Sequence, residues 1–214
     1  MTTRPNKENR NSVHHRFSRD LIFFLTIAFV ITAGVGMAAQ VPQAGAERRV
    51  THRPIESFTL VDQNGAHFDL EKLTSKVVVV AFAYTTCVDV CPLITAALRQ
   101  TQIGLGKEER TRVQLLTITT DPEIDSPKVL KAYGKRYGAE FDNWAFLTGS
   151  SAVLGRVWKN FGVGIKHRGR GLVDHTPLTA IVDEKRLMRF VYVGPSPDPH
   201  AVLDDVHSLL KHQS

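Results

Sequence analysis

Apolar positions from residue 55 onward fall into runs and periodic stretches that predict a mixed α/β domain. Residues 77–84 (VVVVAFAY) and 113–119 (VQLLTIT) are continuous β-branched and aromatic runs, a pattern typical of strands that are buried on both faces of a sheet. Between them, apolar residues recur at helical spacing over 93–98, after Pro92 at the expected helix start and before Gly104 at its end. A strand, a helix and a strand in this order predict two parallel strands joined by a right-handed crossover.

Turn and capping residues predict the remaining elements. Asn64-Gly65 is a tight-turn dipeptide between two short apolar segments, so a small hairpin should open the domain. Ser126 and Ser150 precede helical patterns as N-caps, and two later apolar segments separated by only four residues should pair as antiparallel strands. The expected ranges are helices over 127–137, 151–161 and 199–212, and strands over 178–183 and 188–193.

This order of elements predicts the fold class, which is a mixed α/β sheet with helices on both faces, as in the thioredoxin architecture. The likeness is one of fold alone and does not fix a function. The length of 214 residues, less an apolar N-terminal segment, suits a single domain. With 43% hydrophobic and 22% charged residues, the composition excludes a disordered chain and a protein with many membrane spans.

The N-terminal part of the chain contains the expected membrane segment. Residues 21–39 are nineteen consecutive uncharged positions, close to the ~20 that cross a bilayer as a helix. Five basic residues but only two acidic ones precede them, which keeps 1–20 on the cytoplasmic side and the rest of the chain outside. A cleaved signal peptide is the alternative, because Ala44-Gly45-Ala46 offers a cleavage pattern. The anchor is favoured, because the apolar run exceeds the usual signal core of about 7–15 residues.

These boundaries divide the chain into four segments. They are a basic cytoplasmic tail (1–20), a transmembrane anchor or signal peptide (21–39), a polar tether (40–54) and a thioredoxin-like domain (55–214). The tail is short and carries mixed charge, unlike an organellar targeting region. We therefore expect a single-pass protein of the bacterial inner membrane with its C-terminal domain in the periplasm.

The net charge of +6 does not indicate a nucleic-acid partner. Residues 1–20 supply half of it, and the remainder is spread out apart from the basic segment 166–170. No aromatic residues are interleaved with that segment, as base stacking would require. We expect no nucleic-acid binding, and interpret 166–170 as a solvated turn that could also face an acidic partner.

Cys87 and Cys91, the only cysteines of the chain, are the strongest candidates for chemistry. They lie four positions apart in TTCVDVCP, between the first expected strand of the sheet and its helix. This spacing puts both sulfurs on one side of the first helical turn, where they can form a disulfide or hold one metal ion, and a helix N-terminus favours their thiolates. A disulfide closing so short a loop would add little stability, and a structural zinc site would need four protein ligands. Two thiolates and one imidazole suit Cu(I) and tolerate Cu(II).

His175 is the candidate for the third ligand. It lies in Asp174-His175-Thr176-Pro177, just before the strand expected over 178–183. In thioredoxin-like folds the loop before this strand faces the cysteine helix and usually carries a cis-proline, so we expect a cis peptide bond at Pro177. Of the other histidines, His167 alone could approach the site, from the basic segment.

The same segments resemble the Sco (SCO/SenC) family of copper chaperones, which help to assemble the dinuclear copper centre of cytochrome c oxidase. The resemblance covers nearly all of the expected exported region and is carried by CxxxCP followed by a distant DHT. It implies that Cys87, Cys91 and His175 are copper ligands, and the N-terminal anchor fits the family layout. The chain departs from the family where Val88 replaces a proline that many members have after the first cysteine, and where the turn 183–186 lacks the usual glycine.

The resemblance therefore implies a metallochaperone that binds copper, as Cu(I) or Cu(II), and passes it to the copper-binding subunit of cytochrome c oxidase. The alternative is an exported thiol:disulfide oxidoreductase, in which Cys87 and Cys91 cycle through a disulfide. A peroxidase in which Cys91 resolves a sulfenic acid on Cys87 is a third hypothesis. His175 discriminates between copper binding, which needs its imidazole, and dithiol exchange, which does not.

Overall fold

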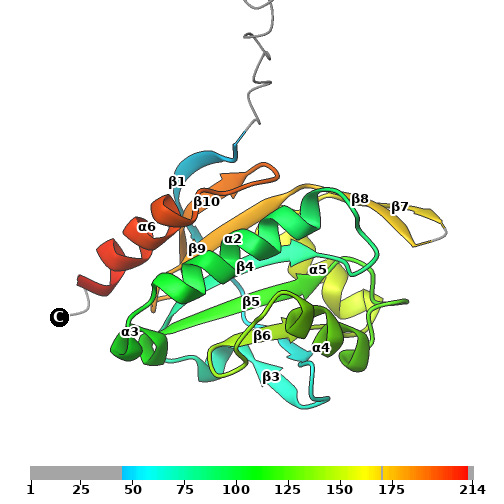
Figure 1. Ribbon diagram of the computed structural model, residues 1–214, viewed down its shortest axis with the longest axis horizontal. Coiled ribbons are helices and arrows are strands. Elements are labelled where there is room, and N and C mark those ends of the chain that lie inside the picture. The colour runs from blue at the N-terminus through cyan, green and yellow to red at the C-terminus, as the bar shows by residue number, and fades with distance from the viewer. Residues whose placement is uncertain (1–44, 170, 212–214) are drawn as a thin grey trace, which may run out of the picture. The chain divides into compact units, whose positions relative to one another are not determined.

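The computed structural model describes residues 45–169 and 171–211. The strands of its central six-stranded sheet are β1 (Glu47–Pro54), β4 (Val77–Ala83), β5 (Val113–Thr119), β6 (Trp144–Leu147), β9 (Leu178–Val182) and β10 (Leu187–Val193). Their order in the sheet is β1-β10-β9-β4-β5-β6 (Figure 1). β4, β5 and β6 run parallel, whereas β9, β10 and β1 continue the sheet through antiparallel pairs.

The two long apolar runs form the middle of this sheet, as predicted. Every residue of β4 and β5 is buried, and the two strands pair in parallel from Val77 opposite Val113 to Ala83 opposite Thr119. The helix α2 (Val90–Gly104) makes the crossover between them. β9 and β10 form the antiparallel hairpin that their short connection predicts.

Helices cover both faces of the sheet, because successive side chains of a strand point to opposite faces. The odd-numbered residues of β4 up to Ala81 pack in one core with α2, α4 (Pro127–Arg136) and α6 (Pro199–Lys211). The even-numbered residues up to Phe82 pack in a second core with α5 (Ser151–Phe161). That core also includes the hairpin of β2 (Thr59–Val61) and β3 (His67–Asp69) and the 3-10 helix η1 (Leu70–Lys72). The predicted mixed sheet with helices on both faces is confirmed.

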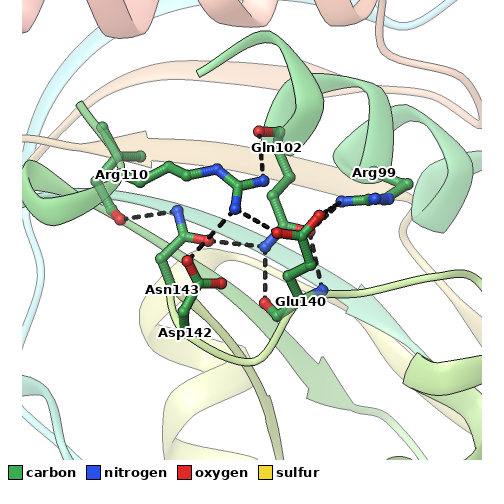
Figure 2. A network of polar contacts seen from close by, with 7 residues as sticks. Arg99, Gln102, Arg110, Glu140, Asp142 and Asn143 are labelled. Carbon is green, nitrogen blue, oxygen red and sulfur yellow. Dashed lines mark hydrogen bonds and ion pairs between the residues drawn. The ribbon is translucent and has the colours of Figure 1, made fainter. Parts of the chain in front are cut away.

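A polar network anchors the C-terminal end of α2, as Figure 2 shows. The fully buried Gln102 donates from Nε2 to the Glu140 carbonyl and to Asn143 Oδ1, both at 2.7 Å. Arg110 of α3 (Lys107–Arg112) forms an ion pair with the Glu140 carboxylate. The network therefore ties α2 and α3 to the segment that precedes β6.

The sheet already includes β1 at Glu47–Pro54, whereas the sequence pattern predicts a domain that begins near Ile55. β1 lies inside the predicted tether (40–54) and pairs with β10 from Glu47 opposite Val193 onward. Almost all of its side chains are exposed, because β1 is an edge strand held through its backbone. Such a strand needs no apolar alternation, and the tether prediction is therefore wrong over 47–54.

Besides β1, three strands lie where the sequence predicts none. β6 has only four residues, too few to show a period. The others form a hairpin of β7 (Ile165–Gly169) and β8 (Leu172–His175), which projects beyond the sheet in Figure 1. The described part of the basic segment, 166–169, therefore belongs to a strand and is not a simple turn.

The peptide bond at Thr176-Pro177 is trans, since no peptide bond in the two described ranges is cis. The cis-proline prediction is therefore wrong. The loop is held instead by paired hydrogen bonds, in which the Thr176 amide donates to the Gly164 carbonyl at 3.1 Å and the Gly164 amide donates to Thr176 Oγ1 at 3.2 Å.

The predicted cytoplasmic tail (1–20) and anchor (21–39) fall outside the described residues. Across 45–169 and 171–211, the structure contains no helix whose length and apolar character would let it cross a membrane.

Candidate metal-binding and redox site

The two cysteines lie where β4 gives way to α2. Cys87 is in the turn after the strand and is partly exposed, whereas Cys91 is in the first turn of α2 and is fully buried. The backbone N–H of Cys91 points at Cys87 Sγ, 3.4 Å away. Neither cysteine is in a disulfide. One sulfur is thus accessible from solvent, and the other lies beneath it.

The environment drives the pKa values of the two thiols apart. A hydrogen bond from the Cys91 thiol lowers the pKa of Cys87 to about 5, and the backbone amides of Cys91 and Asp89 and the Tyr84 hydroxyl act in the same direction. The same hydrogen bond, followed by burial, raises the pKa of Cys91 far above its ordinary value. At neutral pH the pair is one thiolate hydrogen-bonded by one thiol, so Cys87 is the nucleophilic sulfur.

His175 is the histidine that the fold brings to the cysteines. It is the last residue of β8, and its Nε2 lies 3.6 Å from Cys91 Sγ. Nδ1 lies 3.2 Å from the Thr176 carbonyl, which can only accept, so the ring carries its proton on Nδ1. Burial lowers the pKa of His175. The imidazole is therefore neutral at pH 7, with the lone pair of Nε2 directed toward the cysteine pair.

Apolar and aromatic side chains pack against the buried side of the three donors. Val173 of β8 is buried in a small cluster with Ala83, Tyr84 and Cys91. The Tyr84 ring stands edge-on to the His175 ring, with 5.9 Å between centroids. The sequence pattern did not single out Tyr84 or Val173, because their roles depend on β8 lying over the cysteine turn.

The buried carboxyl group of Asp125 holds the turn that leads to Cys87. Asp125 is fully buried and accepts hydrogen bonds from the amide and hydroxyl of Thr85 and from the Thr119 hydroxyl. Burial raises the pKa of Asp125, and these hydrogen bonds act against that rise. Asp125 therefore fixes the residues that lead into Cys87. The acidic pair Asp121 and Asp125 just after the second buried strand is the sequence signal that could have identified it.

The other histidine considered for the site lies elsewhere. His167 is exposed on β7, and its ring centroid lies 6.5 Å from that of Trp158. Within the described ranges, no group of three or more His, Cys, Asp or Glu side chains is already arranged to hold a metal ion. Cys87, Cys91 and His175 nevertheless converge on one another. A shared metal ion would require the partly exposed Cys87 sulfur or the imidazole to move.

The types of donor atom in the site favour some metal ions over others. Two sulfurs and one imidazole nitrogen make a soft, three-donor site, which suits copper better than magnesium or calcium. The fixed Nδ1–H contact to a carbonyl is the type of outer contact that orients a metal-binding histidine. The same thiolate and thiol can also exchange with a disulfide, since the attacking sulfur is ionised and partly exposed.

Comparisons with known proteins agree with this geometry. A family model described as SCO1/SenC matches residues 46–211. The SCO1 protein homolog of Bacillus subtilis (strain 168) is 40% identical over 163 residues, which make up 75% of this chain and 82% of that protein.

Solved structures give the same result. One of them is BsSco, described as a member of the Sco family of cytochrome c oxidase assembly proteins that has a disulfide switch. It matches this chain with a TM-score of 0.66 and 31% identity, over 76% of this chain and 96% of BsSco. Bradyrhizobium japonicum ScoI with copper bound shares a TM-score of 0.58 and 30% identity over 73% of this chain and 99% of that one. The described domain therefore has the predicted thioredoxin-like fold, and the chain belongs to the SCO1/SenC family.

Proposed function

We propose that this chain is a copper metallochaperone that binds copper through Cys87, Cys91 and His175 and delivers it to the dinuclear copper centre of cytochrome c oxidase. The observation that carries the proposal is the convergence of the three donors, with His175 Nε2 at 3.6 Å from Cys91 Sγ although 84 positions separate the two residues. The copper-bound relative from Bradyrhizobium japonicum supports the choice of metal.

The unequal exposure of the two cysteines suits transfer of the metal. Cys87 is partly exposed, and the neighbouring Val88 is 94% exposed, so an incoming thiolate can reach this side of the site. Cys91 is fully buried and His175 is half-buried, and these two ligands would hold copper while the outer ligand exchanges. A buried site with four ligands would release the ion more slowly, so a three-donor site with one open side fits a carrier.

The recipient and the compartment belong to the same proposal. The relative BsSco belongs to the Sco family of cytochrome c oxidase assembly proteins, which supports the copper-binding subunit of that enzyme as the partner. The uncharged run over 21–39 and its basic flank support an anchor in the bacterial inner membrane, with the domain in the periplasm.

The test is a copper titration of the reduced full-length chain, carried out without oxygen, with Cu(I) against a competing chelator. We expect about one copper per chain and no tight binding in Cys87→Ser or Cys91→Ser. In His175→Ala the Cu(I) affinity should fall at least about tenfold, because the loss of even an outer contact of a metal site has an effect of that size. His167→Ala is the matched control, because His167 is exposed on the partner strand of the same hairpin. Copper binding that is unaffected by either cysteine variant would refute the proposal.

A thiol:disulfide oxidoreductase is the second candidate, and the low pKa of Cys87 beside a Cys91 thiol favours it. The disulfide switch of the relative BsSco also supports it. In this function Cys87 attacks a partner disulfide and Cys91 then displaces the partner thiol, leaving the Cys87–Cys91 disulfide. Disulfide reduction that survives in His175→Ala, in a chain without tight copper binding, would favour this candidate over the first.

A further inference from the structure

The β7–β8 hairpin brings His175 to the cysteines, yet it is a two-stranded ribbon outside the main sheet. Its ladder is short and irregular, with a register shift between His167 and Gly169. A lone pair of strands is only marginally stable in water. Contacts with the rest of the domain must therefore fix the hairpin, and with it the position of the imidazole.

One such contact links the hairpin tip to the cysteine turn. The Thr86 hydroxyl donates to the Gly171 carbonyl at 2.9 Å, and Thr86 immediately precedes Cys87 in the chain. The residues that this contact joins are 85 positions apart. It is therefore a direct link between the segment that carries the first cysteine and the segment that leads to His175.

The hairpin tip is also packed closely at this point. Gly171 has a φ of +71°, and a Cβ added there would lie 2.6 Å from Ile124 Cδ1 and 3.5 Å from Thr86 Oγ1. Gly169, on the other side of the tip, also has a positive φ of +81°, but an added Cβ would meet nothing within 4 Å. A side chain at 171 would therefore have to displace the end of the Ile124 side chain, in addition to adopting an unfavourable backbone conformation.

Two other contacts hold the hairpin, but neither lies at its tip. The Val173 side chain of β8 packs against Ala83, Tyr84 and Cys91. The Gly164–Thr176 hydrogen bonds hold the opposite end of the hairpin. Neither contact fixes the tip, from which the chain runs through Leu172 to His175 in a single short strand. Losing the contact at Thr86 should therefore loosen β8 over the cysteines without unfolding the domain.

We propose that Thr86 is a positioning residue, whose hydrogen bond to Gly171 fastens the hairpin over the cysteine turn and keeps His175 within reach of the Cys91 sulfur. This inference rests on the proposed copper-binding function and deepens it. Thr86 is not a ligand, and it acts on copper only through the imidazole.

The first test is a cycle of variants in the same Cu(I) competition titration of the reduced full-length chain. Thr86→Val removes the donor but keeps the shape, and should weaken Cu(I) binding by roughly threefold to tenfold, the equilibrium equivalent of one ordinary hydrogen bond. Thr86→Ser keeps the donor and should bind as the unaltered chain does. In a His175→Ala background, Thr86→Val should cause no further loss. An equal loss with and without His175, or no loss at all, would overturn the inference.

The second test needs no copper and so separates this inference from the proposed function. In the metal-free chain, Thr86→Val and Gly171→Ala should accelerate amide hydrogen exchange in 165–169 and 172–175, whereas Thr86→Ser and the matched control Gly169→Ala should change it less. A chain that binds no copper but shows this pattern would refute the metallochaperone and leave the hairpin contact established. Exchange that is unchanged in both Thr86→Val and Gly171→Ala would exclude the contact as a determinant of hairpin position.

Discussion

Cys87 and Cys91 are chemically identical side chains that the fold makes different. The turn leaves Cys87 at the surface, where backbone amides and the Tyr84 hydroxyl point at its sulfur. α2 buries Cys91, where an ionised sulfur would lose its hydration. The difference in accessibility is therefore also a difference in charge, and it makes Cys87 the first sulfur to meet an incoming partner.

This difference can be measured by alkylation of the metal-free, reduced chain with iodoacetamide at a series of pH values. Only a thiolate reacts, so the Cys87 rate should rise as the pH passes about 5 and stay level above that, because its folded-state pKa is about 5 and not the ordinary 9.0. Cys91 should stay unmodified throughout. Mass spectrometry of the peptides distinguishes the two.

The matched control is Cys91→Ala, which removes the largest cause of the low pKa. The midpoint of Cys87 alkylation should then move upward, toward the value of a free cysteine. A Cys87 rate that still climbs between about pH 7 and 9 in the unaltered chain would contradict the assignment of Cys87 as the thiolate.

At the scale of elements, serine caps set where two helices begin. Ser150 accepts the Val153 amide at 3.4 Å and α5 starts at the next residue, and Ser126 does the same for α4. α5 then ends at Phe161, and the capping residue Gly162 has a φ of +76°, the left-handed conformation that follows many helix C-termini. Both boundaries agree with the sequence pattern, because capping is local chemistry.

Replacing the α5 cap should cost stability without touching the site. Ser150→Ala removes one acceptor for the free amides of the first turn and should lower the free energy of unfolding by about 1 kcal/mol. Ser151→Ala is the control, since Ser151 is the first residue inside the helix, is exposed and caps nothing. Urea denaturation of the three proteins provides the measurement. An equal loss at both positions would show that the cap at Ser150 contributes nothing of its own.

Two of the strands that could not be predicted, β1 and β7, share a physical reason. β4 and β5 are buried on both faces, so their sequences are apolar throughout. β1 and β7 are mostly exposed and gain stability from backbone pairing, which any side chain permits. Sequence patterns report burial, and exposed strands therefore read as tether or turn.

The residues of the candidate site also fall into those that the sequence predicted and those that it did not. Cys87, Cys91 and His175 were found from residue type, spacing and resemblance, because their chemistry is specific to those side chains. Thr86 and Val173 carry no such signature. Each matters only because the β7–β8 hairpin lies over the cysteine turn, and no sequence pattern predicted that hairpin.

At the scale of the whole molecule, the N-terminal end of α2 contributes to the candidate site and its C-terminal end contributes to stability. Its N-terminal turn presents Cys91 to His175, whereas its C-terminal turn is fixed by Gln102 and the polar network of Figure 2. The first end is partly open and must exchange ligands under the proposed function. The second is closed by buried hydrogen bonds, so the stability of the molecule and the chemistry of the site rest on separate residues.

This separation predicts a variant that weakens the fold and leaves copper binding intact. Gln102 also accepts hydrogen bonds from Arg99 and from the Glu140 amide, so Gln102→Ala leaves several groups without their partner, including the buried Asn143 Oδ1. The free energy of unfolding should fall by about 2–4 kcal/mol. Gln100→Ala, at an exposed position of the same helix, should change the free energy of unfolding by less than about 0.5 kcal/mol.

At temperatures where it stays folded, the Gln102 variant should bind Cu(I) as the unaltered chain does, because no residue of the network reaches the cysteines. A parallel loss of stability and Cu(I) affinity would mean instead that the far end of α2 controls the position of Cys91.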